Sequence, residues 1–230
     1  MAIPVIAICG IATDEASWRD MPVTCIFVPR GNGIAAMADA ILAQLPERFA
    51  LCGHSMGGYV ALEIARQSGG RLAGLALLGS SAAADTPEQR AARDAVIAQA
   101  GQDFDGVAER LAPAMLSRAS RAMPGLLAET RAMLMRCGGS IFAEQQAAAA
   151  ARPDYRASLA SIAVPTLVLA GDADRIVAPD RSREIAAAIR GATLETLLDC
   201  GHLPQREAPG PVAFFLRQWA DEVTKPRSGR

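Results

Sequence analysis

Apolar residues in this chain gather into six short runs that alternate with stretches of helical periodicity. The runs occupy residues 3–9, 23–28, 49–52, 72–78, 164–170 and 193–198, and the helical stretches occupy residues 35–45, 56–68, 180–189 and 211–223. Short, continuously apolar runs are typical of strands that are buried on both faces of a parallel sheet. The alternation therefore predicts a doubly wound α/β fold whose sheet has about six, mostly parallel strands.

Residues 82–160 break this alternation. They contain no convincing strand, only helical sequence rich in Ala, Arg and Met that is interrupted at Pro87, Pro113, Pro124, Gly138, Gly139 and Pro153. A connection of this length is too long for an ordinary loop, since loops beyond about 12–15 residues are uncommon in compact domains. We expect a helical cap at residues 82–160, inserted into a core formed by residues 1–81 and 161–230.

Composition narrows the possible functions. The 230 residues carry 23 Lys and Arg against 24 Asp and Glu, a net charge of −1, with 51% hydrophobic and 20% charged residues. This hydrophobic content excludes an intrinsically disordered chain. The net charge shows no basic excess of the kind that nucleic-acid-binding proteins have. No run of 18 apolar residues is present, so no membrane span is expected. We predict a small-molecule substrate and a monomer or homodimer.

Cysteine and histidine usage bears on compartment and cofactors. The five cysteines are odd in number and form no Cys-x-x-Cys pair, and residues 1–9 lack the Lys or Arg that opens a signal peptide. This pattern predicts a cytoplasmic protein. Only His54 and His202 are available as imidazole ligands. A metal centre is therefore not expected, and neither is an organic cofactor.

The main chemical signal is Gly53-His54-Ser55-Met56-Gly57-Gly58 between a predicted strand and a predicted helix. A Gly-x-Ser-x-Gly turn in this position exposes the serine hydroxyl, and its glycines allow close approach of neighbouring backbones. An ordinary glycine-rich turn is the alternative. The placement between strand and helix favours Ser55 as a nucleophile.

A serine nucleophile needs a base and an orienting acid, which on this type of fold follow it in the order acid, then histidine. His54 is adjacent to Ser55 and cannot easily turn its ring onto that hydroxyl, which leaves His202 as the base. For the acid we favour Asp174, which lies furthest into the loop after residues 164–170. Three other carboxylates remain possible: Asp172, Asp85 and Asp199.

Two backbone N–H groups must stabilise the oxyanion of the tetrahedral intermediate. One is predicted from Met56, which follows the nucleophile and begins a helix. The second is expected from the loop after the first strand, with Ile11 as the leading candidate.

These motifs, together with Gly171 to Asp174 and Gly201-His202, resemble the α/β-hydrolase fold superfamily, nearest to its small carboxylesterase and acyl-hydrolase members. The landmarks run from residue 9 to 209 in the order expected for that superfamily. The resemblance has two departures. Cys9 stands where the superfamily usually has a histidine before the oxyanion-turn glycine, and its first two strands are absent.

The resemblance and the triad predict an esterase that acts on small to medium acyl esters through an acyl-enzyme. The same residues could serve acyl transfer, carbon–carbon bond hydrolysis, perhydrolysis or a lyase step, because a fold does not dictate a reaction. A non-catalytic binding or scaffold protein is the remaining alternative. Methionines and leucines of the cap could form an adaptable pocket, although core packing is the more common role. Four cap arginines could meet an anion or form a solvated face: Arg118, Arg121, Arg131 and Arg136.

Overall fold

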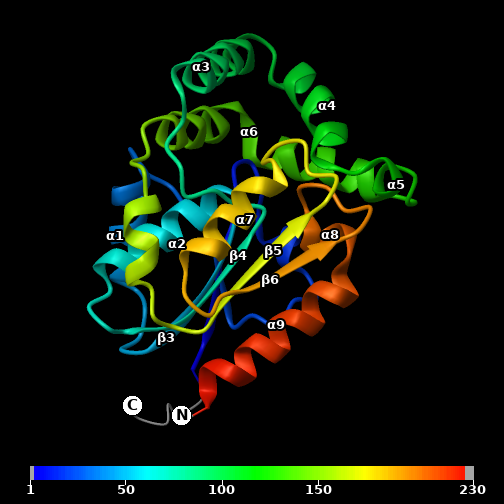
Figure 1. Cartoon of the computed structure of the whole chain (residues 1–230). Coiled ribbons are helices and arrows are strands. Elements are labelled where there is room, and N and C mark those ends of the chain that lie inside the picture. Colours follow the sequence, from blue (N-terminus) through cyan, green and yellow to red (C-terminus); the bar gives the residue numbers. More distant parts are fainter. Residues whose placement is uncertain (1–2, 226–230) are drawn as a thin grey trace.

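The computed structural model describes residues 3–225, and these contain one six-stranded sheet (Figure 1). The strand order is β2-β1-β3-β4-β5-β6, and every neighbouring pair is parallel. The strands are β1 (Val5–Ile8), β2 (Cys25–Phe27), β3 (Phe49–His54), β4 (Leu72–Leu78), β5 (Thr166–Gly171) and β6 (Thr193–Leu197). All six predicted strands are present, β4 with the predicted ends and the other five with shifted ends, which confirms the predicted doubly wound α/β fold.

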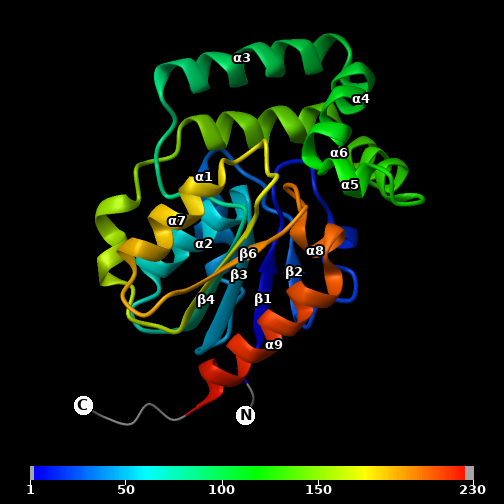
Figure 2. The same ribbon diagram turned by 45° about the vertical axis from the view of Figure 1, so that its right-hand side comes forward.

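Alternate strand residues point to opposite sides of the sheet and are apolar on both sides, so helices pack on both faces. Ile6 and Ile8 of β1 pack with α1 (Ile34–Leu42), α2 (Met56–Gln67) and α7 (Pro179–Ala188). Val5 and Ala7 of β1 pack on the opposite face with α9 (Pro209–Thr224) (Figure 2). The short α8 (Pro204–Glu207) precedes α9, and 3₁₀ helices occupy Glu15–Trp18 and Arg156–Ser161. The two apolar layers hold the sheet in place between them.

Four helices are inserted between β4 and β5. They are α3 (Pro87–Gln102), α4 (Phe104–Met115), α5 (Arg118–Arg121) and α6 (Leu126–Ala150). In Figure 2, α3 is the outermost element, and α6 lies between α3 and the sheet. An apolar cluster that includes Leu116, Leu134 and Phe142 joins the inserted helices to Ala12 and Leu203 of the core. The inserted helices form the predicted helical cap, whose limits at residues 82 and 160 stay a prediction.

Of the helix interruptions expected in the insertion, the one at Gly138 is confirmed and the one at Pro113 is wrong. Gly138 (φ 77°, ψ 159°) kinks α6 as expected. The interruption expected at Pro113 is wrong, because α4 continues through it to Met115. Pro113 lies in the last turn, so its missing N–H removes one hydrogen bond near the end of the helix and leaves the earlier turns intact. Within residues 3–225, no helix is both long enough and apolar enough to cross a membrane.

Candidate active site

Ser55 lies in the tight turn between β3 and α2, in a backbone conformation that side-chain-bearing residues rarely adopt. Its φ is 53° and its ψ is −118°. Its N–H donates to the carbonyl of Leu78 at 2.9 Å, and the Ser80 hydroxyl donates to the Ser55 carbonyl at 2.9 Å. Strained residues persist only where their surroundings fix them, and they cluster at functional sites. The turn thus fixes the Ser55 hydroxyl above the end of the sheet.

The glycines on either side of Ser55 are required by close backbone contacts. A Cβ on Gly53 would lie 2.4 Å from the Gly57 carbonyl oxygen, and one on Gly57 would lie 2.2 Å from the Ile8 carbonyl oxygen. Both distances are far below van der Waals contact. The Gly-x-Ser-x-Gly spacing therefore follows from the packing of α2 against β1 and β3.

The structure brings His202 and Asp174 to this turn. His202 Nε2 lies 2.9 Å from Ser55 Oγ, and His202 Nδ1 lies 2.8 Å from Asp174 Oδ2. All three residues are buried. A carboxylate can only accept, so the Nδ1–H donates to Asp174 and leaves Nε2 to accept the Ser55 proton. The three predicted residues thus form a continuous hydrogen-bonded chain.

Asp174 is held in its charged form. Burial raises the pKa of this carboxyl, but the charge and hydrogen bond of His202 and the N–H groups of Val177 and Ile176 outweigh burial, so the pKa lies below its ordinary value. The two N–H groups donate to Oδ1 at 2.9 and 2.8 Å. Both oxygens therefore have partners, and the carboxylate is oriented toward the imidazole.

The other candidate acids lie elsewhere. Asp172 is exposed and accepts the Cys200 N–H at 3.3 Å, which is the turn role that its position suggests. Asp85 forms ion pairs with Arg93 and Arg152. Asp199 is exposed at a left-handed position, with a φ of 53°. Of the four carboxylates considered, only Asp174 contacts His202.

His54 has a structural contact that its position in the motif did not reveal. Burial, followed by the nearby His202 charge, lowers its pKa from 6.5 to about 3. Its Nε2 lies 2.6 Å from the His202 carbonyl oxygen, so the neutral ring carries its proton on Nε2 and donates it. His54 thereby supports the backbone of His202.

Glu207 holds the loop that carries His202. Its side chain accepts the N–H groups of Ser117 (2.9 Å), Gly201 (2.8 Å) and Leu203 (2.9 Å). Two of these donors flank His202, and Ser117 begins the α5 turn of the insertion. This buried carboxylate therefore joins the histidine loop to the inserted helices. The backbone partners of Glu207 could not be read from the sequence.

The two predicted oxyanion donors lie beside Ser55. Met56 is the first residue of α2, where backbone N–H groups have no intrahelical acceptor. Ile11 lines the same cavity as Ser55 and His202. Gln145 of α6 fixes the loop that carries Ile11: it accepts the Ala12 N–H at 2.8 Å and donates to the Pro29 carbonyl at 3.0 Å. Sequence reasoning missed Gln145, which lies in an alanine-rich helix without a motif.

A cavity of about 80 Å³ opens above Ser55 and His202. Its walls are largely apolar, with Leu111 and Met115 contributed by α4. It shares Arg93, Leu111, Gln146 and Ile176 with a larger groove of about 420 Å³ between the inserted helices. The groove and the cavity at Ser55 therefore adjoin each other.

Core packing, the more common role, applies to most of the apolar cap residues that could have formed a pocket. Leu116, Leu126, Met133 and Leu134 are buried in the apolar cluster of the insertion, and Met115 both packs there and lines the inner cavity. Among the arginines, Arg131 pairs with Asp105 and Glu109, and Arg136 pairs with Asp14. Arg118 is exposed, and Arg121 donates to the Ser117 carbonyl. None of these four arginines lines the inner cavity.

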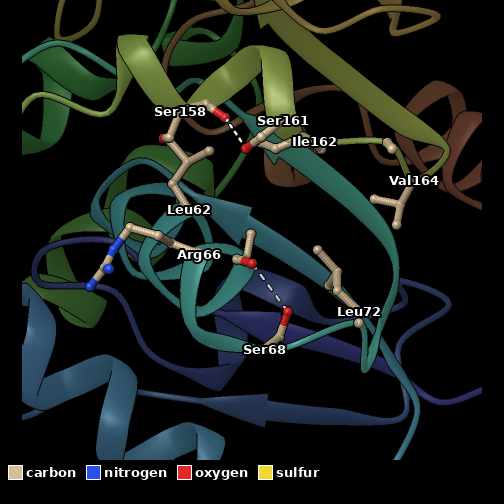
Figure 3. A pocket seen from close by; sticks show the side chains of 11 residues that line it. Leu62, Arg66, Ser68, Leu72, Ser158, Ser161, Ile162 and Val164 are labelled. Carbon is tan, nitrogen blue, oxygen red and sulfur yellow. Dashed lines mark hydrogen bonds between the residues drawn. The ribbon is translucent and has the colours of Figure 1, made fainter.

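A separate cavity of about 260 Å³ lies where α2 ends and β4 and β5 begin (Figure 3). Its hydroxyl groups are already used locally, since Ser68 donates to the Ala65 carbonyl and Ser161 to the Ser158 carbonyl. None of the predicted site residues lines it. This cavity has no connection to the chemistry at Ser55.

The cysteines and possible metal ligands complete the description. Cys9 lies 4.0 Å from the Ser17 hydroxyl, and burial raises the pKa of its thiol to about 12. Burial also raises the pKa of Cys200. Cys9 and Cys200 are therefore poor nucleophiles at neutral pH. In the part of the chain that the structure describes, no three His, Cys, Asp or Glu side chains lie close enough to hold a metal ion.

Known enzymes are similar in sequence to most of this chain. The chain is similar to a pimeloyl-[acyl-carrier protein] methyl ester esterase of Aromatoleum aromaticum, with 29% identity over 199 residues that cover 81% of this chain and 80% of the relative. It is also similar to the enzyme of the same name from Neisseria meningitidis serogroup A, with 27% identity over 230 positions that cover 94% and 72% of the two chains.

Solved structures show the same fold. A thermophilic esterase from Thermogutta terrifontis, solved with malate bound, superposes with a TM-score of 0.87 at 28% identity and covers 98% of this chain and 92% of its own. A hydrolase from Pseudomonas aeruginosa superposes with a TM-score of 0.82 at 29% identity, covering 94% and 89%. Residues 10–213 match the sequence model of the alpha/beta hydrolase family. The chain therefore belongs to the alpha/beta hydrolase family.

Proposed function

We propose that this protein is a serine esterase that cleaves small to medium carboxylic esters with Ser55, His202 and Asp174. The observation that carries the proposal is the continuous hydrogen-bonded chain from Ser55 Oγ through His202 to Asp174. An alcohol becomes a useful nucleophile when a positioned imidazole accepts its proton. The names of the curated relatives, which are methyl ester esterases, support an ester as the bond that is cleaved.

The first half-reaction forms an acyl-enzyme. Ser55 Oγ attacks the ester carbonyl carbon while His202 Nε2 accepts its proton. Asp174 keeps the proton of Nδ1 in place and stabilises the imidazolium. The tetrahedral intermediate then expels the alcohol, whose oxygen takes the proton back from Nε2. In the second half-reaction a water molecule, deprotonated by His202, attacks the acyl group and releases the acid and free Ser55.

The Met56 and Ile11 N–H groups are the proposed donors to the oxyanion. The Met56 N–H stands at the positive end of α2, which favours developing negative charge. Each such donor is worth on the order of 10²–10³ in kcat, because the donors are fixed before the reaction begins. Gln145 contributes indirectly by holding the loop of Ile11.

The inner cavity limits the proposed substrates to compact groups near the scissile bond, and the larger groove leaves room for a longer acyl chain. Methyl esters belong to this class, in agreement with the methyl ester named for the relatives. The monomeric or homodimeric state and the cytoplasmic location stay predictions, as do the absence of a nucleic-acid partner and of a cofactor.

A panel of p-nitrophenyl esters of rising acyl length, assayed with the wild-type protein and Ser55→Ala, tests the function. We expect the highest kcat/KM for short to medium chains and a loss of about 10³-fold or more in kcat for Ser55→Ala. Near-wild-type turnover by Ser55→Ala would overturn the nucleophile. Activity confined to long-chain lipids would overturn the substrate class.

A further inference from the structure

Arg93 of α3 lies where the cavity above Ser55 meets the larger groove, and it lines both spaces. Its side chain is 21% exposed, so it is accessible from the groove without being a free surface residue. Among the residues that line the inner cavity, Arg93 is the only one of the types Lys, Arg, Asp and Glu. A substrate group that occupies both spaces would therefore lie near Arg93.

The charges around Arg93 do not balance. Asp85 Oδ2 accepts from Arg93 Nε at 2.5 Å, and Asp85 Oδ1 pairs with Arg152 at 2.7 Å. Asp85 and Arg152 are almost fully buried, with side-chain exposures of 3% and 4%. Within residues 3–225 neither guanidinium forms an ion pair with a second carboxylate. One carboxylate thus serves two cations, and the group keeps one positive charge at the edge of the cavity.

The hydrogen bonds of the two arginines indicate that the unmatched positive charge lies on Arg93. Arg152 is occupied by the carbonyls of Ala83 and Ala149 in addition to Asp85. Arg93 uses only Nε, toward Asp85, and one nitrogen toward Gln146. A guanidinium has five N–H groups, so Arg93 retains donors that no other described residue uses. Asp85 and Gln146 also hold the guanidinium in a fixed orientation.

The groove outside Arg93 is positively charged as well. Arg110 of α4 lines the groove, and its side chain donates to the amide of Gln99 without a carboxylate partner in the described residues. The one carboxylate that lines the groove, Asp85, is the buried one already shared by two arginines. An anionic group in the groove would therefore meet two cations and no exposed acid.

We infer that Arg93 binds a carboxylate carried by the acyl part of the substrate, so that the preferred substrates are monoesters of dicarboxylic acids. This inference rests on the proposed esterase function. The ester carbonyl lies at Ser55 and the carboxylate at Arg93, which forms charge-assisted hydrogen bonds with it. The small volume of the inner cavity requires a short connection between the two ends.

The test compares monomethyl and dimethyl esters of the same acids, from succinate to suberate. For the wild-type protein we expect at least a 10-fold higher kcat/KM for the monomethyl ester of the best chain length. Arg93→Gln should lose about 10- to 100-fold on the monomethyl ester, the range expected when a hydrogen bond to a charged group is removed. The preference over the dimethyl ester should disappear with it.

Arg90→Gln is the matched control, since Arg90 lies on the same helix, is exposed and lines neither space. It removes the same charge and should retain the preference. Arg93→Lys, which keeps the charge, should retain part of it. If Arg93→Gln does not fold, competitive inhibition of the wild-type protein by the free dicarboxylic acid, but not by its diamide, supports the inference.

Two results would overturn the inference and leave the esterase function standing. One is a wild-type protein that hydrolyses dimethyl esters as well as or better than monomethyl esters. The other is an Arg93→Gln variant that lowers both rates equally, which would mean that Arg93 only supports the insertion. Failure of the proposed function itself is recognised separately, by ester turnover in Ser55→Ala that equals that of the wild type.

Discussion

The end of the sheet around Ser55 and the helical insertion above it are held in place by different kinds of interaction. At the end of the sheet, backbone groups fix each residue of the proposed triad. The Ser55 N–H donates to Leu78, Asp174 accepts two N–H groups, and the His202 N–H donates to the Met115 carbonyl at 2.8 Å. In the insertion, the outer helix α3 buries only Ala100. The helix α6 is joined to the core by side-chain ion pairs: Arg136 with Asp14, Glu144 with Arg30 and Glu129 with Arg206.

This difference indicates how the two regions divide the work. Backbone hydrogen bonds between neighbouring elements hold atoms with the precision that proton transfer at 2.9 Å requires. Exposed ion pairs contribute little to stability and allow small shifts of the helices that they join. We therefore expect kcat to change with substitutions near the end of the sheet or of insertion residues that hold its loops. Other substitutions in the insertion should change substrate preference.

The largest effect is expected from Asp174→Asn. The Ile176 and Val177 N–H groups would hold the amide oxygen, so the amide NH₂ would face His202 Nδ1 and donate to it. His202 would then carry its proton on Nε2 and could not accept the Ser55 proton, so kcat should fall by about 10³- to 10⁴-fold. Steady-state hydrolysis of a p-nitrophenyl ester measures the loss. Asp172→Asn, in the same loop but without contact to His202, is the matched control and should stay within a few-fold of wild type. Equal activity of the two variants would remove Asp174 from the proposed triad.

Gly57→Ala is expected to cost several kcal/mol of folding free energy or to prevent folding, because its Cβ would lie 2.2 Å from the Ile8 carbonyl oxygen. Urea unfolding of the purified protein measures the change. Gly101→Ala, at a helical position where nothing lies within 4 Å, is the control and should stabilise the protein slightly. A fully stable Gly57→Ala variant would show that the turn does not need this packing.

Gln145→Met tests whether the insertion helps to position the oxyanion loop. Methionine keeps the length of the side chain but leaves the Ala12 N–H without its acceptor, which should cost about 1–3 kcal/mol of stability. We also expect kcat to fall about 10-fold with little change in KM, because the loop of Ile11 loses its support. Loss of stability with an unchanged kcat would show that Gln145 only joins the insertion to the core.

The smallest effect concerns pH and His54. Above pH 6.5 the ring is neutral in both the folded and the unfolded chain, so it contributes nothing to the pH dependence of stability. Below 6.5 only the unfolded chain takes up a proton until pH approaches the folded-state pKa of about 3, so stability falls as pH falls. Between pH 7 and pH 5 this loss is about 2 kcal/mol. Urea unfolding of His54→Gln should show a correspondingly weaker acid dependence, and identical pH profiles would contradict the buried neutral ring.

Residues of the end of the sheet could be predicted from the sequence because local patterns mark them. Ser55 lies between the glycines of a Gly-x-Ser-x-Gly motif that follows an apolar run. Besides its neighbour His54, the sequence has only one histidine, His202. Asp174 followed from its place in the loop after a predicted strand, although Asp172 stood two residues away. The strands themselves were visible as apolar runs, since strands buried on both faces need apolar side chains throughout.

The supporting residues could not be predicted, because their partners are distant in sequence. Gln145 and Ala12 are 133 residues apart, and Glu207 and Ser117 are 90 apart. Such contacts depend on how the insertion packs on the core, which no local pattern encodes. The expected helix interruption at Pro113 failed for a related reason: the local rule for proline does not say how close the residue lies to the end of its helix.

The most direct test of the proposed mechanism is covalent labelling with a fluorophosphonate, which reacts with an activated serine. Digestion and mass spectrometry of the labelled wild-type protein should place the adduct on Ser55 alone, and Ser55→Ala should remain unlabelled. Labelling of the folded Ser55→Ala protein to the wild-type level, or no reaction of the folded wild type, would contradict the assignment of Ser55 as the nucleophile.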